Sequence, residues 1–171
     1  SAASDVYKRQ LPMFSTAISL CPGNVFSSLS VFYINAGKAS FFQRDYAAAQ
    51  AFLEKALALY GQFDSFWRRP TMNSYLALTL VKNRNLSAAR RHLLAAQKYM
   101  WQMKNPSDQG SVFFSQALIR AWADQDPEVG RFFDELLPDP ALDYGRLALK
   151  HLSRWLDRPE INSLLRLFPE L

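Results

Sequence analysis

The sequence predicts an all-α, helical-repeat solenoid of antiparallel helix pairs, because small and apolar residues recur with a period of 40. Within one period, a small residue is followed twelve positions later by a second one, and apolar residues follow four and seven positions after that. The equivalent positions, aligned without gaps, are Gly37, Ala77 and Ala117; Ala49, Ala89 and Val129; Leu53, Leu93 and Phe133; and Ala56, Ala96 and Leu136. Units of this kind bury their apolar faces against the next copy. No alternation with a period of two persists, so the sequence predicts no sheet.

Capping and helix-breaking residues divide the chain into the predicted helices. Pro22 and Gly23 end the first of them, and Asp45, Asn85 and Asp126 can each cap a later one. The predicted helices cover residues 13–20, 26–43, 46–60, 71–82, 86–103 and 111–123, then one that starts at residue 127, and finally 142–156 and 159–168. The segments 61–70 and 105–110 are predicted connections.

The predicted helices divide the chain into four parts. Residues 1–10 carry no helical period that leads into Leu11, and their string DVYKRQ resembles translated sequencing-adapter read-through of the kind found in metagenomic reading frames. We expect this segment to be non-native or disordered. Residues 11–24 then read as the end of a truncated upstream repeat, 25–137 as three repeats, and 138–171 as a C-terminal pair of capping helices.

Composition is that of a water-soluble chain with a sizeable core. The 171 residues are 49% hydrophobic and 20% charged, with a net charge of +5. No apolar run approaches the roughly 18 residues of a membrane span, so we expect no membrane insertion. The chain has one cysteine, which excludes an internal disulfide, and no signal-peptide pattern. We therefore expect a cytoplasmic protein.

Residues that could carry enzymatic chemistry are few. The two histidines, His92 and His151, lie among apolar and basic residues and do not have the spacing of metal ligands. Cys21 has no general base near it in sequence, and the six glycines form no phosphate-binding loop. We expect no enzymatic activity, no cofactor and no metal site.

Two segments of the chain resemble tetratricopeptide repeats. Residues 35–57 (NAGKASFFQRDYAAAQAFLEKAL) carry the small and aromatic residues of that family, and residues 75–97 match it again. Residues 114–136 form a weaker third copy. The family's usual period is about 34 residues, and the longer period here is similar to that of repeats in some bacterial regulators. The resemblance implies a scaffold that binds protein or peptide, and we expect the chain to be the C-terminal interaction or regulatory module of a larger bacterial protein, with further domains upstream.

In the resembling family the first helix of each pair lines a concave ligand groove. Carried over by register, the groove residues are Ile34, Lys38, Phe41, Ser74, Leu78, Val81, Phe114 and Leu118. The carboxylate clamp of some family members is missing, because Ile34, Ser74 and Leu78 stand where it needs lysine or asparagine. The groove would be apolar with one central lysine, which suits an amphipathic helix or extended peptide. Alternatively, Phe41, Leu78 and Leu118 pack between neighbouring helices or under the C-terminal cap.

A second candidate surface is basic. No acidic residue occurs from 65 to 107, and the cations there include Arg68, Arg69, Lys82, Arg84, Arg90, Arg91 and Lys98. Aromatic residues are interleaved with them, a combination that also suits single-stranded nucleic acid. The alternatives are an acidic peptide or neighbouring domain as partner, or an ordinary solvated helix face. A nucleic-acid-binding repeat is therefore the second hypothesis, and a small secretion-type chaperone, which the truncated start argues against, is the third.

Overall fold

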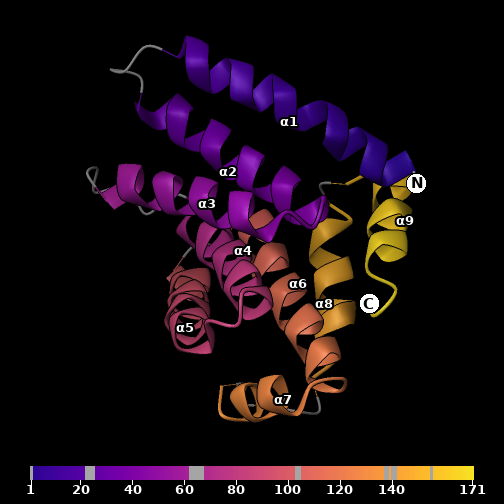
Figure 1. Cartoon of the computed structure of the whole chain (residues 1–171). Coiled ribbons are helices and arrows are strands. Elements are labelled where there is room, and N and C mark those ends of the chain that lie inside the picture. The colour runs from indigo at the N-terminus through magenta and orange to yellow at the C-terminus, as the bar shows by residue number, and fades with distance from the viewer. Residues whose placement is uncertain are drawn as a thin grey trace.

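The computed structural model describes residues 2–21, 26–61, 68–102, 105–136, 139, 142–154 and 156–171. Within these ranges every regular element is a helix (Figure 1). The helices are α1 (Ala2–Leu20), α2 (Phe26–Phe42), α3 (Tyr46–Gly61), α4 (Arg69–Lys82), α5 (Leu86–Gln102), α6 (Pro106–Ala123), α7 (Pro127–Asp134), α8 (Tyr144–Leu152) and α9 (Arg158–Leu167). The all-α prediction is thus confirmed for the described part of the chain.

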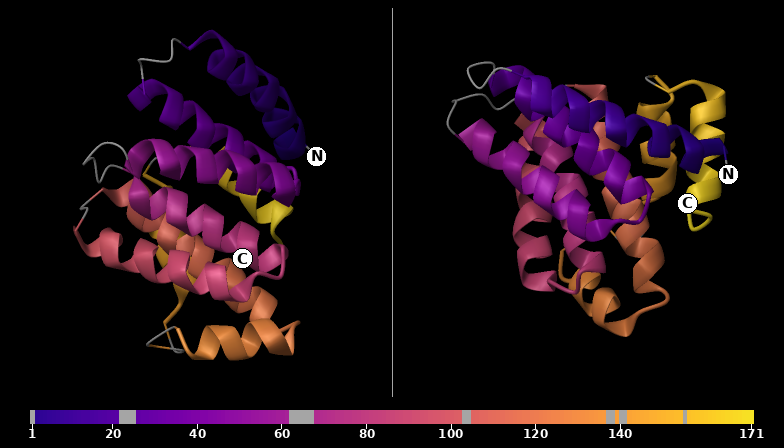
Figure 2. Two further views of the ribbon diagram at one scale, coloured as in Figure 1. Left: turned by 60° about the vertical axis from the view of Figure 1, so that its left-hand side comes forward. Right: turned by 45° about the horizontal axis from the view of Figure 1, so that its top comes forward.

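Helices that follow one another along the chain pack side by side from α1 to α7, and α4 also lies against α6 (Figures 1 and 2). The last two helices depart from this order. Helix α8 packs on α6, and α9 runs beside α1, so that both ends of the chain lie on the same side of the molecule (Figure 1). The C-terminal segment therefore folds back across helices from earlier in the chain, α6 and α1.

The first two helix pairs turn in the same way. Arg44 and Arg84, forty residues apart, each end a helix in the left-handed conformation, with φ of 64° and 60°. In both turns the next residue donates its backbone N–H to a carbonyl five positions back, at 3.0 Å from Asp45 and 2.9 Å from Asn85. This is the Schellman ending of a helix, with arginine where glycine is usual. The periodicity in the sequence thus corresponds to two equivalent backbone turns.

The predicted caps are confirmed. The side chain of Asp45 accepts a hydrogen bond from the N–H of Ala48 at 3.0 Å, and Asn85 does the same for Ala88 at 3.2 Å. Asp126 accepts from the N–H groups of Glu128 and Val129. Each cap satisfies backbone donors that a helix N-terminus otherwise leaves unpaired.

Some predicted boundaries are wrong. The segment 105–110 is not a connection, because α6 begins at Pro106 with Asn105 as its N-cap. Gly110 lies inside α6, and a Cβ there would come within 2.9 Å of Cδ2 of Leu152, so this glycine allows α8 to approach closely. Helix α4 starts two residues earlier than predicted, and α8 is shorter at both ends.

Residues 2–10, which the sequence predicts to be non-native or disordered, are helical. Helix α1 runs without interruption from Ala2 and continues through Pro12. The ring of Tyr7 stacks on Phe42 with 4.4 Å between centroids, and the Gln43 side chain donates a hydrogen bond to the Tyr7 carbonyl at 2.8 Å. The non-native origin of this segment stays a prediction. Residues 22–25 and 62–67, which the sequence assigns to connections, lie outside the described residues.

Small residues set the distance between helices at the core. A Cβ on Gly37 would lie 2.6 Å from Cγ of Leu53, so α2 and α3 meet where glycine leaves room, as the sequence predicts. Ala77 is fully buried on α4. Helix α4 is the central element, because every residue from Pro70 to Val81 is buried against the helices around it.

Candidate functional site

The predicted groove is not open. Seven of its eight residues are buried, with at most 3% of each exposed: Ile34, Phe41, Ser74, Leu78, Val81, Phe114 and Leu118. Ile34 packs with Ala56, Tyr60 and Met72, and so belongs to the core between α2, α3 and α4. The hydroxyl of Ser74 donates to the Pro70 carbonyl within its own helix at 2.6 Å. The accessibility predicted for these residues is therefore wrong, and only Lys38 remains half-buried.

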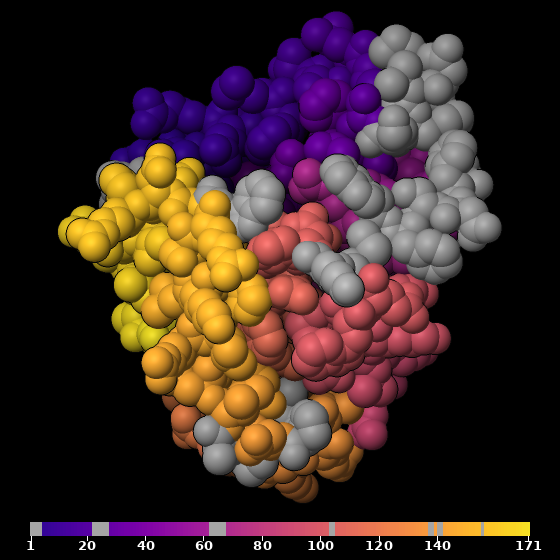
Figure 3. Space-filling model, turned by 180° about the vertical axis from the view of Figure 1, so that it is seen from behind, coloured from indigo at the N-terminus to yellow at the C-terminus, as the bar shows by residue number. Residues whose placement is uncertain are grey.

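The C-terminal segment covers the aromatic side of the bundle. We call Phe41 and Phe42 of α2, Tyr75 of α4 and Phe114 of α6 the aromatic face. Phe168 stacks on Phe41, with 5.6 Å between centroids and 16° between ring planes, and meets Phe42 and Phe114 at 5.8 and 5.9 Å. The main-chain carbonyl of Leu167 accepts a hydrogen bond from Arg44 at 3.1 Å. Seen from behind, α8 and α9 continue the surface of α1 across this side (Figure 3).

The 40-residue period alone could not reveal that the C-terminal segment covers the aromatic face. The periodicity placed Phe41 and Phe114 on the first helices of their pairs, but it did not show that a segment more than forty residues away would lie over them. Of the two readings that the sequence left open for Phe41, packing under the C-terminal cap holds. Phe114, which was predicted only as a groove residue, lies under the same cover.

A half-open hollow lies between the cover and the bundle. It has a volume of about 270 Å³ and lies among α1, α2, α4, α6, α8 and α9. Its aromatic and larger aliphatic lining residues are Tyr7, Phe14, Phe42, Tyr75, Phe114, Leu152, Leu156 and Leu164. Its polar lining residues are Gln10, Asn35, Lys38, Ser107, Ser111 and Glu160. Polar and apolar surface thus contribute about equally to its wall.

Among the residues that the structure describes, Lys38 is the one cation in the lining of this hollow. Its ammonium lies 5.4 Å from the centroid of the Tyr75 ring, within the range of a cation–π contact. The pKa of Lys38 is lowered from its ordinary value of 10.5 to about 8, mainly by burial and in part by the Arg68 guanidinium, while the Asp108 carboxylate acts in the opposite direction. Lys38 forms no ion pair within the described ranges.

Asp108 is a buried carboxyl beside this site that sequence reasoning missed. One of its oxygens accepts a hydrogen bond from Thr71 at 2.6 Å, and the other is buried without a hydrogen-bond partner. Burial raises its pKa, while the Thr71 hydroxyl and the cations Arg68 and Lys38 lower it. The signal that could have revealed it is the Asn105-Pro106 pair, which is a typical helix start and places Asp108 in the first turn.

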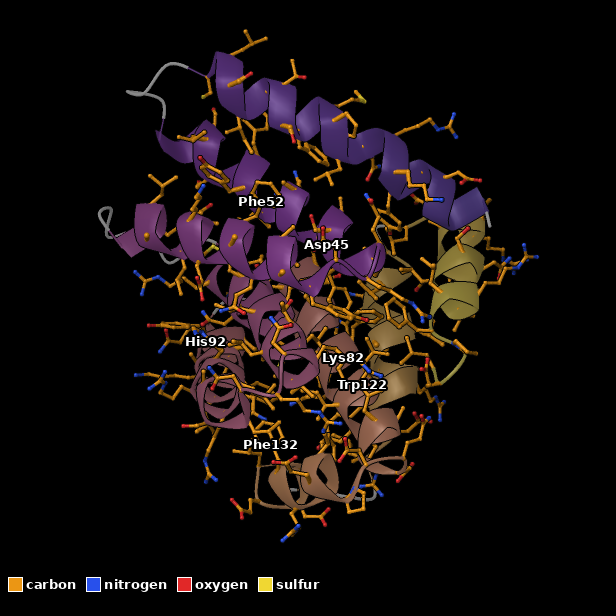
Figure 4. The ribbon with its side chains drawn as sticks, in the orientation of Figure 1. Asp45, Phe52, Lys82, His92, Trp122 and Phe132 are labelled. Carbon is orange, nitrogen blue, oxygen red and sulfur yellow. The ribbon has the colours of Figure 1, made fainter. Side chains whose placement is uncertain are left out.

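The predicted basic patch is dispersed. Arg84 pairs with Asp126 and, at 3.7 Å, with Glu128, while Arg90 pairs with Glu135. Lys82 lies over the Trp122 ring at 3.8 Å (Figure 4). Arg69 donates a hydrogen bond to the Tyr99 hydroxyl at 3.2 Å, and Arg68 is half-buried. Acidic residues in and at the ends of α7 thus pair with two of the seven predicted cations.

The remaining two cations, Arg91 and Lys98, lie on the outer side of α5 and form no ion pair in the described part of the chain. Leu94 and Trp101 lie on the same side, with 45% and 75% exposed. Ser87 completes the row. We call these five residues, spaced by four and three positions along one helix face, the α5 outer face. The sequence contains this spacing, but Leu94 and Trp101 were not singled out as surface residues.

The histidines and the cysteine have ordinary surroundings. Nδ1 of His92 contacts Oδ1 of Asn73 at 2.8 Å, and burial lowers the pKa of His92. His151 stacks on Phe113 with 5.4 Å between centroids. Cys21 is half-buried at the end of α1. Among the residues that the structure describes, no group of three or more histidine, cysteine or acidic side chains could hold a metal ion.

Comparisons with family models, curated proteins and solved structures found no significant match to this chain. Within the described helices, none combines the length and the apolar character that crossing a bilayer requires.

Proposed function

We propose that the chain is a tetratricopeptide-like scaffold, acting as an interaction module of a larger protein, that binds an acidic amphipathic helix of a partner on the α5 outer face. The repeat interpretation is supported by the two equivalent turns at Arg44 and Arg84 and by the consecutive side-by-side packing of α2 to α7. Binding on the outer side, instead of the groove that the resemblance implies, follows because the aromatic face is already covered.

The observation that carries the proposal is the exposure of Trp101 beside Lys98, which forms no ion pair with any described residue. Tryptophan is among the residues that most often dominate binding energies at protein interfaces. Leu94, about two helical turns before Trp101, adds a second apolar contact on the same side. A partner helix with leucines at helical spacing would bury both side chains.

Charge decides which amphipathic helix fits. No acidic residue occurs between 65 and 107, so a basic segment that approaches the α5 outer face meets the like charges of Arg91 and Lys98. Glutamate or aspartate on either side of a partner's apolar stripe would lie opposite Arg91 and Lys98. Such pairs at an interface rim mainly raise the association rate and select the partner, whereas the apolar anchors supply most of the affinity.

A phosphate backbone fits this surface less well than a peptide. The affinity for nucleic acid rises with the number of cations that contact successive phosphates. Arg84 and Arg90 already have carboxylate partners at the two ends of α7, which leaves Arg91 and Lys98 as the cations of α5 that form no ion pair with described residues. Trp101 is the one exposed tryptophan in the described part of the chain, and it provides one stacking position, where strand-binding folds use several.

The test is titration with a labelled amphipathic peptide that has leucines at helical spacing and glutamates on its flanks, followed by fluorescence anisotropy. Trp101→Ala should weaken binding by at least about 30-fold, which corresponds to the roughly 2 kcal/mol of a hot spot. Lys98→Glu should slow association and reverse its dependence on salt. Neither exposed substitution should change the unfolding free energy by more than about 0.5 kcal/mol.

The matched control is Lys55→Glu, which makes the same charge change at an exposed position of α3 and should leave binding unchanged. A peptide with lysine in place of glutamate should bind far more weakly. Equal binding of both peptides, or full binding by Trp101→Ala, would refute the proposed surface. Tighter binding of a single-stranded oligonucleotide, with a steep loss of affinity in salt, would replace the peptide proposal by the nucleic-acid one.

A further inference from the structure

We propose that the open groove between α8 and α9 binds an extended, acidic segment of a partner protein, with an aliphatic side chain between its carboxylates. The groove shares no residue with the α5 outer face, and its test does not depend on the helix proposed to bind there. Charge, the aliphatic floor of the groove and an amide side chain in its wall each match one feature of such a segment.

The groove lies between two helices that are held by different parts of the chain. Helix α8 packs on α6, and α9 packs on α1. Both belong to the surface seen in Figure 3, where they are drawn in orange to yellow. The groove between them has a volume of about 610 Å³ and is open to solvent along its length. Small ligands are usually buried in concave pockets, so this open shape favours a segment of a larger molecule.

Each helix turns one face to the groove. The lining residues are spaced by three and four positions along their helices: Arg146, Leu149, Lys150 and Ser153 on α8, and Arg158, Ile161 and Asn162 on α9. Both helices therefore contribute a cationic, an aliphatic and a hydrogen-bonding side chain.

The charge of this lining is positive. Arg146, Lys150 and Arg158 form no ion pair with any described residue, and none of the described residues that line the groove is acidic. Burial and, to a smaller extent, the nearby cations Arg154 and Lys150 lower the pKa of His151, the next residue of α8. Carboxylates of a partner would therefore be attracted from both sides of the groove.

The acidic residues nearest to the groove in sequence are engaged at helix starts. Asp143 accepts a hydrogen bond from the backbone N–H of Arg146 at 2.8 Å. Asp157 and Glu160 form the capping box of α9, in which Glu160 accepts from the Asp157 N–H at 2.9 Å. Glu160 also lines the hollow under the cover. These carboxylates reduce the positive potential, but they do not pair with the three cations of the groove.

The neutral residues of the groove select the kind of acidic partner. Leu149 is 36% exposed and Ile161 is half-buried, so they offer contact to one apolar side chain. Asn162 is exposed, and its amide can both donate to and accept from a peptide backbone. An extended segment has backbone N–H and C=O groups available for this pairing, whereas a helix uses most of them internally.

Phosphate-based partners match fewer of these groups. The phosphate oxygens of a lipid surface or a nucleic acid accept hydrogen bonds and donate none, so they would use only the N–H side of Asn162. The described lining of the groove also has no aromatic side chain on which a base could stack.

The experiment is titration of the full chain with a labelled peptide that has one leucine between pairs of glutamates and a proline at each end, which disfavours a helix. Anisotropy should show binding at least about tenfold tighter than that of the same peptide with glutamine in place of glutamate. Lys150→Glu should weaken binding by at least about tenfold, whereas Lys98→Glu, the same charge change at an exposed position of α5, should change it by less than about twofold. Asn162→Leu, which keeps the size of the side chain, should weaken binding by about fivefold, as expected for one hydrogen bond.

Equal affinity for the glutamate and glutamine peptides, no binding at millimolar peptide, or equal losses in Lys150→Glu and Lys98→Glu would each overturn the proposal. Tighter binding of phosphatidylserine vesicles or of a single-stranded oligonucleotide, abolished by Lys150→Glu, would also overturn it, because the groove would then serve a lipid surface or nucleic acid. Trp101→Ala should leave this peptide's affinity unchanged while weakening the helical peptide on the α5 outer face, so the failure of either proposal is distinguishable from the failure of the other.

Discussion

Helices α4 and α5 belong to one pair of the predicted repeat, yet they have opposite surroundings. Every residue of α4 from Pro70 to Val81 is buried. Helix α5 is buried along one side only, and its other side carries Leu94 and Trp101 in solvent. The difference teaches that the surroundings of each helix follow its sequence, because α4 has no charged residue from Pro70 to Val81, whereas α5 carries Arg90, Arg91 and Lys98.

The C-terminal segment explains part of this difference. It packs on the side of the bundle where α2, α4 and α6 carry the aromatic face. Tyr75 of α4 lies at the centre of that face, in ring contact with Phe41, Phe42 and Phe114. Helix α5 lies away from the cover. Its Arg90 forms an ion pair with Glu135 at the end of α7. One surface is therefore sealed by the chain itself and another is left open.

Removal of the covering ring should give the largest effect on stability. Phe168→Ala deletes a buried aromatic side chain that contacts three others, so the free energy of unfolding should fall by about 3–5 kcal/mol. Denaturant titration measures it. The comparison variant is Phe52→Ala, which truncates a half-buried ring on α3 and should cost clearly less (Figure 4). Equal losses in the two variants would mean that Phe168 does not cover the aromatic face.

A smaller effect should come from the contact between α2 and α3. In Gly37→Ala the new Cβ would lie 2.6 Å from Cγ of Leu53, so the two helices must shift, at a cost of about 1–3 kcal/mol. Gly61→Ala, at the end of α3, meets no atom within 4 Å and should be neutral or stabilising by up to about 1 kcal/mol. Comparing the thermal unfolding of the two variants shows whether each substitution lowers or raises the stability. A stabilising Gly37→Ala would refute the close approach of these helices.

Local features of the fold could be predicted from the sequence because they depend on neighbouring residues. Asp45 and Asn85 cap helices through their own side chains, and Gly37 marks the close contact through its lack of one. The period of 40 was sufficient to place these residues in equivalent turns. Each of these signals lies within one helix pair.

The candidate sites could not be predicted in the same way because they depend on long-range packing. Lys38 was singled out, but its partners come from α1, α4, α6 and α9. Phe114 was predicted to be accessible and instead packs against Phe168, 54 positions further along the chain. No periodicity encodes that contact, because the C-terminal segment lies outside the repeat.

The central claim is that the aromatic side is sealed while the α5 outer face is open, and the rate of cysteine labelling tests it directly. With Cys21 replaced by serine, a thiol-reactive dye is applied to two variants. Leu94→Cys places the thiol at an exposed position, and Leu78→Cys places it at a fully buried one. We predict that Leu94→Cys reacts almost as fast as the unfolded chain and that Leu78→Cys is protected by roughly 100-fold or more, because its labelling requires an opening of the fold. Equal, fast labelling at both positions would show an open groove and contradict the account.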